Sequence, residues 1–267
     1  MRHRDPRRAR RGLSALAIAL PLVIALGGPA CSSTPASAPR APLTISFDYR
    51  YDTRGFFADP ARRATLEAAA RVWTSRLHDT FPRTPAGSKV LLVQPESQQP
   101  ITVELAADHE GVLVFVGANV LADHVGGQAG PGGTPGGAVD DARRALQDRL
   151  YADDFEPFVG SLTFSTVPTW FVDPTPETEG DAPAGQADLL SIATPELGHV
   201  LGFGTAPRFL RLTEDEALSL SPDRYHFLDS AASGARRPCM YVSPENGRRS
   251  VPTALDLEVF AAMGYEP

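Results

Sequence analysis

The spacing of apolar positions changes several times along the chain, and each change predicts a different element. In "LTISFDYRY" (43–51), apolar side chains alternate with polar ones, which is typical of a half-buried strand. Between residues 60 and 81 the spacing becomes three and four, which predicts an amphipathic helix with Pro60 in its first turn. The apolar face of that helix comprises Leu66, Ala70, Trp73, Leu77 and Phe81.

Two further apolar runs, "ITVELA" (101–106) and "GVLVFVGA" (111–118), predict strands joined by the turn-like "ADHE". The glycine-rich stretch 126–137 has neither the Lys-Ser/Thr ending of a P-loop nor the G-x-G-x-x-G spacing of a dinucleotide site. We therefore expect a flexible surface loop there.

The second half of the chain alternates helical, extended and irregular segments. Residues 140–150 predict a short helix, 160–166 a strand, and 173–185 an acidic, proline-rich loop. Together these elements predict an α+β domain with a mixed sheet over residues 43–267.

The N-terminus has the composition of an export signal. Residues 1–30 contain six arginines and then the apolar run "LSALAIALPLVIAL". The small residues before Cys31 resemble a bacterial lipoprotein processing site, although ordinary signal cleavage nearby is the alternative. Residues 31–42 then form a lipidated cysteine and a Pro/Ser/Ala-rich tether. We expect an exported lipoprotein of the cell envelope that meets the membrane through its lipid anchor only, or a secreted protein if Cys31 is not lipidated.

Charge and cysteine content narrow the possible partners. The chain has a net charge of −7, and removal of residues 1–30 would leave 19 basic and 31 acidic residues, a net charge of −12. Such a charge disfavours nucleic acid as a partner. Beyond Cys31 the sequence contains only Cys239, so the exported part has no internal disulfide. We expect a monomer.

The stretch "IATPELGHVLGFG" (192–204) differs by one residue from the zinc-protease pattern H-E-x-x-H. In that pattern two histidines on one helical face hold zinc, and the glutamate between them polarises the bound water. Glu196 and His199 stand in register, but Pro195 occupies the position of the first histidine. Alone, E-x-x-H is a weak motif, since a single histidine at the end of an apolar helix is more often structural.

Other segments extend the similarity over nearly the whole exported chain. "YHFLDS" contains His226, "PCMYVSPENG" contains Met240, and "SVPTALDLEVFAAMGY" provides a closing helix. With the predicted strands, these segments resemble the metzincin-like zinc metallopeptidases of the bacterial secreted type, with leishmanolysin-like ligand order.

The resemblance implies a single catalytic-type domain with a mixed sheet, an active-site helix and a methionine turn. It assigns His199 and His226 as zinc ligands, Glu196 as general base and Met240 as support beneath the site. It also implies a protein or peptide as substrate or ligand.

Pro195 departs from this family pattern. Proline has no ligating side chain and destabilises a helix interior by roughly 3 kcal/mol. The helix either continues through Pro195, with a kink, or begins there with Thr194 as N-cap. In the second case Glu196 would lie in the first turn, where it stabilises the positive end of the helix without any catalysis.

Three hypotheses follow from the sequence. The first is a zinc-dependent endopeptidase-like protein whose catalysis is impaired or lost because of Pro195, with zinc bound weakly or not at all. The second is a non-catalytic peptide- or protein-binding lipoprotein, a pseudopeptidase. The third, a scaffold with a chance E-x-x-H, requires the other segments to be coincidental. His78, His109 and His124 are expected at the surface, and one of them could supply a substitute ligand.

Overall fold

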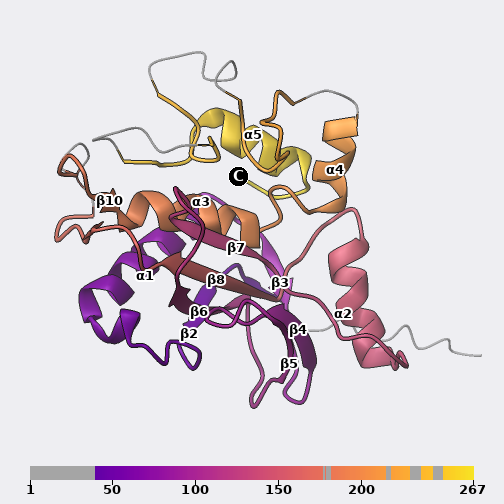
Figure 1. The fold of residues 1–267 in the computed structure, drawn as a ribbon. Coiled ribbons are helices and arrows are strands. Elements are labelled where there is room, and N and C mark those ends of the chain that lie inside the picture. Colours follow the sequence, from indigo (N-terminus) through magenta and orange to yellow (C-terminus); the bar gives the residue numbers. More distant parts are fainter. Residues whose placement is uncertain (1–39, 177, 179–181, 215–217, 229–235, 243–248) are drawn as a thin grey trace, which may run out of the picture. The chain divides into compact units, whose positions relative to one another are not determined.

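A four-stranded mixed sheet forms the centre of the domain (Figure 1). Its strand order is β2 (Ile45–Asp48), β6 (Val112–Asn119), β8 (Val159–Ser165) and β7 (Gly127–Pro131). The first three strands are parallel, and β7 pairs antiparallel with β8 at the edge. The predicted α+β class with a mixed sheet is confirmed.

The computed structural model describes residues 40–176, 178, 182–214, 218–228, 236–242 and 249–267. The predicted export signal, Cys31 and all of the tether except its last three residues lie outside these ranges. Within them, no helix is both long and apolar enough to cross a membrane.

Two helices pack against the sheet and against each other. Helix α1 (Pro60–Thr74) contacts β2 and α3 (Leu189–Val200), and α3 in turn lies over β7 and β8 (Figure 1). The central strands are buried, as expected for parallel strands covered by other elements. In β6, for example, Val112, Val114, Phe115 and Val116 are completely buried.

Helix α1 is shorter than predicted. Asp59 caps it by accepting a hydrogen bond from the Ala61 amide, and it ends at Thr74 instead of continuing to residue 81. The chain then turns so that Thr80–Pro82 forms strand β3, which pairs with β1 (Arg40–Pro42). Leu77 and Phe81 are nevertheless buried. Their spacing therefore predicted burial correctly, but it predicted helical structure wrongly.

The predicted strands at 101–106 and 111–118 exist but belong to different sheets. Strand β5 (Pro100–Glu104) pairs with β4 (Lys89–Val93), which the sequence analysis did not identify. Strand β6 follows β5 along the chain and pairs with β2 and β8 instead.

The glycine-rich stretch 126–137 is not entirely a loop, because Gly127–Pro131 forms the edge strand β7. The prediction of a loop was wrong for these five residues. Glycine is unfavourable in strands, so the glycine-rich composition of the stretch had suggested irregular structure. Glycine is required by close packing: a Cβ atom on Gly127 would lie 2.8 Å from Glu196 Cγ.

The remaining elements frame the site. The predicted helix and strand at 140–150 and 160–166 are confirmed as α2 (Asp141–Tyr151) and β8, and the predicted closing helix as α5. The other elements are η1 (Phe56–Ala58), β9 (Trp170–Phe171), β10 (Ala187–Asp188), α4 (Pro207–Glu214) and α5 (Ala254–Ala262).

Candidate metal and peptide site

Helix α3 continues through Pro195. It begins at Leu189, where the Asp188 side chain accepts a hydrogen bond from the Ser191 amide at 3.2 Å. Pro195 is therefore an interior residue of the helix, and Thr194 is not the N-cap. Of the two arrangements that the sequence allowed, the structure has the one in which position 195 shares a helical face with His199.

His199 lies near the end of α3 and is buried, with 8% of its surface exposed. Its ring Nδ1 is 2.9 Å from the carbonyl oxygen of Phe203, to which it donates. The chain reaches that position by turning at Gly202, where φ is +103° and a Cβ atom would lie 2.7 Å from the Phe155 ring. Glycine at this position is thus required by both backbone conformation and space.

His226 approaches from the loop after α4. Its Nδ1 lies 2.8 Å from Asp223 Oδ2, and Asp223 is itself held by the Ser221 hydroxyl and by the Tyr225 amide. The net effect on Asp223 is a lowered pKa: partial burial opposes this, but the hydrogen bonds from Ser221, Tyr225 and His226 outweigh it. The carboxylate therefore stays ionised as an acceptor for His226.

The two histidines meet at their other ring nitrogens. His199 Nε2 lies 3.3 Å from His226 Nε2, and the ring planes are inclined at 86°. A neutral imidazole that donates from Nδ1 carries its lone pair on Nε2. With both Nδ1 atoms bound to acceptors, neutral rings in this tautomer direct their Nε2 lone pairs into this gap.

This arrangement fits two ligands of a metal ion. With Zn–N bonds of about 2.05 Å, nitrogen atoms 3.3 Å apart subtend roughly 107° at the metal, close to tetrahedral geometry. Histidine ligands also typically donate their second ring N–H to a carbonyl or carboxylate, as His199 and His226 do.

A catalytic zinc site has three protein ligands, and the described residues bring only two histidines together here. In the described part of the chain, no group of three or more His, Cys, Asp or Glu side chains is placed to hold a metal ion. Pro195 occupies the position from which a third imidazole would reach the pair. Thr205, which also lines the cavity beside His199, is exposed.

Glu196 lies between α3 and β7, against Gly127. Burial raises the pKa of its carboxyl to about 8, so the group is mostly protonated at neutral pH. Glu196 is the eighth residue of α3, which excludes the interpretation that it stabilises the first helical turn. A cation held by the two histidines would lower its pKa again.

The buried position of His199 lowers the affinity of its ring for a proton. Burial lowers the pKa of His199 to about 4, with a further contribution from the nearby His226 ring. His199 is consequently neutral at pH 7, the form in which imidazole binds metals.

Met240 lies beneath the helix, completely buried. A Cβ atom on Gly198 would be 2.5 Å from its sulfur, so only glycine fits at that point of α3. The turn is fixed by Asp256 of α5, whose carboxylate accepts hydrogen bonds from the Cys239 and Met240 amides at 3.0 Å each. The sequence analysis missed Asp256, although Thr253 and Asp256 form a recognisable capping box at the start of α5.

The three histidines without a motif differ in position. His78 is exposed, and His109 is half-buried with its Nε2 3.2 Å from the Ser46 hydroxyl. His124 is exposed on the loop before β7 and lines the same cavity, of about 250 Å³, as Pro195 and His226. Of the three, His124 is thus the one beside the site.

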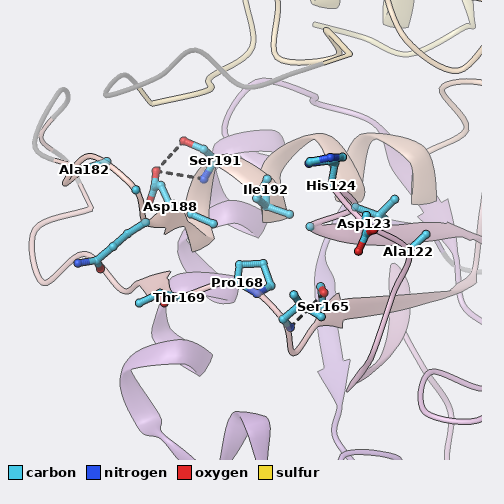
Figure 2. A pocket seen from close by; sticks show the side chains of 16 residues that line it. Ala122, Asp123, His124, Ser165, Pro168, Thr169, Ala182, Asp188, Ser191 and Ile192 are labelled. Carbon is cyan, nitrogen blue, oxygen red and sulfur yellow. Dashed lines mark hydrogen bonds between the residues drawn. The ribbon is translucent and has the colours of Figure 1, made fainter.

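Three neighbouring cavities run along the exposed side of α3. The cavity of about 250 Å³ shares Gly127, Glu196 and His226 with one of about 410 Å³ that includes His199 and Tyr225. On its other side it shares Ser191 and Ile192 with a cavity of about 590 Å³ at the start of the helix (Figure 2).

Comparison of the chain with protein-family models, with curated proteins and with solved structures gave no match.

Proposed function

We propose that the chain is a metal-binding protein whose two histidines, His199 and His226, bind a zinc ion. More specifically, we propose a metzincin-like, zinc-dependent endopeptidase-like protein in which catalysis is impaired or lost because Pro195 replaces a ligand. The observation that supports this best is the 3.3 Å separation of the two Nε2 atoms, with both Nδ1 atoms bound to acceptors.

The chemistry at Glu196 favours impaired catalysis. Zinc in such a site supplies an acidified water molecule for hydrolysis. A general base must be ionised to accept a proton from that water, and burial raises the pKa of Glu196 to about 8. Without a firmly held cation beside it, Glu196 is a poor base at neutral pH.

The second candidate function is peptide binding without cleavage, and the edge of the sheet favours it. Among the described residues, no strand pairs with the free edge of β7. An extended peptide can add to such an edge through backbone hydrogen bonds, with its side chains in the neighbouring cavities. The succession of cavities beside β7 and α3 matches that mode of binding.

The proposal includes export and attachment to the cell envelope through a lipid on Cys31. It rests on the sequence of residues 1–39, outside the described ranges. Mass spectrometry of the purified protein checks it: the expected mature N-terminus is a lipidated Cys31.

Zinc titration with a competing chromophoric chelator tests the metal site. We expect the wild-type chain to bind zinc weakly, and His199→Ala and His226→Ala each to abolish binding. His124→Ala serves as the control for a substitute ligand and should leave the affinity unchanged. Casein cleavage, measured on the same samples, should be slow or absent in the wild type.

Several outcomes contradict the proposal. Zinc binding that survives both histidine substitutions would place the metal elsewhere. Tight binding and fast cleavage by the wild type would mean that another residue completes the site. Loss of affinity in His124→Ala would identify that residue.

A further inference from the structure

The largest of the three cavities, about 590 Å³, lies beyond the histidine pair at the start of α3 (Figure 2). Its lining comes from the loop before β7, the loop after β8, and the residues that lead into α3. It shares five residues with the cavity beside Pro195, so the two are continuous. The shared residues are His124, Val125, Gly126, Ser191 and Ile192.

The cavity combines apolar side chains with polar groups. Val125, Val167 and Ile192 contribute aliphatic surface, and the first two are substantially exposed. Ser165 and Asp188, which are both buried, add polar groups to the lining. A lining with both aliphatic and polar groups suits a long side chain whose stem is apolar and whose tip is polar.

The described residues in and beside this cavity carry an excess of negative charge. Asp173 and Asp188, both buried, are paired with the same guanidinium, that of Arg249. Two carboxylates around one guanidinium leave an excess negative charge among these three residues. Among the described residues, the cavity lining contains no Lys or Arg, and it includes a further carboxylate, Asp123, at the opposite side from Asp188 (Figure 2).

The structural role of Asp188, capping α3, uses only one of its two carboxylate oxygens. Oδ2 accepts hydrogen bonds from Ser191 and Arg249 and thereby caps α3. Oδ1 is buried and has no hydrogen-bond partner among the described residues. A buried carboxylate oxygen without a donor is costly, which favours the approach of a cationic group.

We propose that this cavity binds the basic side chain, Arg or Lys, of a polypeptide that lies along β7 and α3. The proposal rests on the peptide-binding function proposed above and adds a preference for a positively charged residue at one position. The aliphatic stem of that residue packs against Val125, Val167 and Ile192, and its cationic tip is attracted by Asp188, while Asp123 adds negative charge at the other side of the cavity.

A pair of matched substitutions in the full chain tests the cavity without disturbing Asp188, which also caps the helix. Thr169 is exposed and lines the cavity, whereas Thr166 is exposed on the same loop and does not line it. Thr169→Lys places a cation in the cavity, and Thr166→Lys makes the same change in net charge outside it.

The first probe is a fluorescent alanine-rich peptide with one arginine at successive positions, compared with the same peptide containing citrulline, its neutral isostere. At the preferred position we expect wild type and Thr166→Lys to bind the arginine peptide roughly tenfold more tightly. In Thr169→Lys the two peptides should bind equally. The second probe, butylguanidinium against butylurea followed by ligand-observed NMR, should show the same preference.

The outcomes separate this inference from the proposed function. Equal binding of both peptides by the wild type would overturn the inference and leave peptide binding intact. Another outcome is that neither peptide binds, while the wild type, but not Thr169→Lys, still binds butylguanidinium in preference to butylurea. That outcome would support the cation site and overturn peptide binding. A butylguanidinium preference that is absent, or that survives in Thr169→Lys, would overturn the inference.

Discussion

The indole N–H of Trp73 on α1 donates a hydrogen bond to the carbonyl oxygen of Thr194 on α3, at a distance of 2.8 Å. Both residues are completely buried. Thr194 immediately precedes Pro195, so α1 holds α3 at the turn where proline interrupts the helical hydrogen bonds. This contact helps to explain how the helix keeps its course through an interior proline.

Replacement of Trp73 by Phe should therefore lower the free energy of unfolding by at least about 1 kcal/mol, because a buried carbonyl loses a donor. The space left by the indole adds to the loss. Urea unfolding measures the effect. Trp170→Phe is the control, since the indole of Trp170 donates to the Ser165 carbonyl and not to α3. Only Trp73→Phe should also weaken zinc binding; equal effects of both variants on zinc would contradict a positioning role.

Two substitutions of Pro195 distinguish the effect of the proline on helix stability from the effect of the missing histidine on zinc affinity. Pro195→Ala restores the amide and should raise the free energy of unfolding by up to about 3 kcal/mol without changing zinc affinity. Pro195→His should also stabilise the helix, and it returns a histidine pair at i and i+4.

We expect a partial rescue of zinc affinity and casein cleavage in Pro195→His and none in Pro195→Ala. The helix is already formed on both sides of position 195, so the new imidazole should face His199. Zinc affinity that is the same in both variants would show that the site has changed beyond one residue, which favours the peptide-binding function.

Asp223 should tune the metal site through His226. Asp223→Asn keeps an oxygen acceptor but removes the charge that holds the His226 Nδ1–H. We expect zinc affinity at pH 7 to fall by about tenfold or more, as is typical of such partners. Asp123→Asn, an exposed residue on another loop, is the control. An unchanged affinity in Asp223→Asn would leave Asp223 only a role in shaping the loop.

The ion pair between Asp173 and Arg249 should make stability depend on pH in acid. Burial acts to raise the pKa of Asp173, but hydrogen bonds from Arg249 and Thr175 outweigh it, so the pKa is lowered. A lowered folded pKa stabilises the protein above the unfolded value of about 3.9, and the contribution is lost as pH falls through the folded value. Wild type should exceed Asp173→Asn in Tm at pH 7, and the difference should shrink below about pH 4. A difference that is constant with pH would show that the effect is not ionic.

Much of the site could be predicted from sequence because its residues belong to short patterns. Glu196 and His199 lie about one helical turn apart in the stretch 192–204, and Gly202, in the same stretch, makes the turn after the helix. That His226 would lie beside His199 could be expected only from the resemblance of several segments to one family, since no local sequence rule connects His226 to α3. Asp223 is three residues before His226, yet nothing in that spacing distinguishes it from an ordinary loop aspartate.

Other features depended on tertiary contacts that the sequence does not reveal. Thr194 and Asp188 are both good N-cap residues, and the choice of Asp188 follows from its burial beside Ser191 and Arg249. Strand β7 consists of residues with low strand propensity, and it forms because β8 offers a partner and α3 requires close approach.

The histidine pair joins positions 27 residues apart in the chain. A cation shared by His199 and His226 would close that segment into a ring, much as a disulfide does, and would remove conformational entropy from the unfolded chain. The sequence after Cys31 contains Cys239 as its only cysteine, so a metal cross-link would take the place of an internal disulfide in this part of the chain. The two histidines would then stabilise the fold whether or not the protein hydrolyses anything.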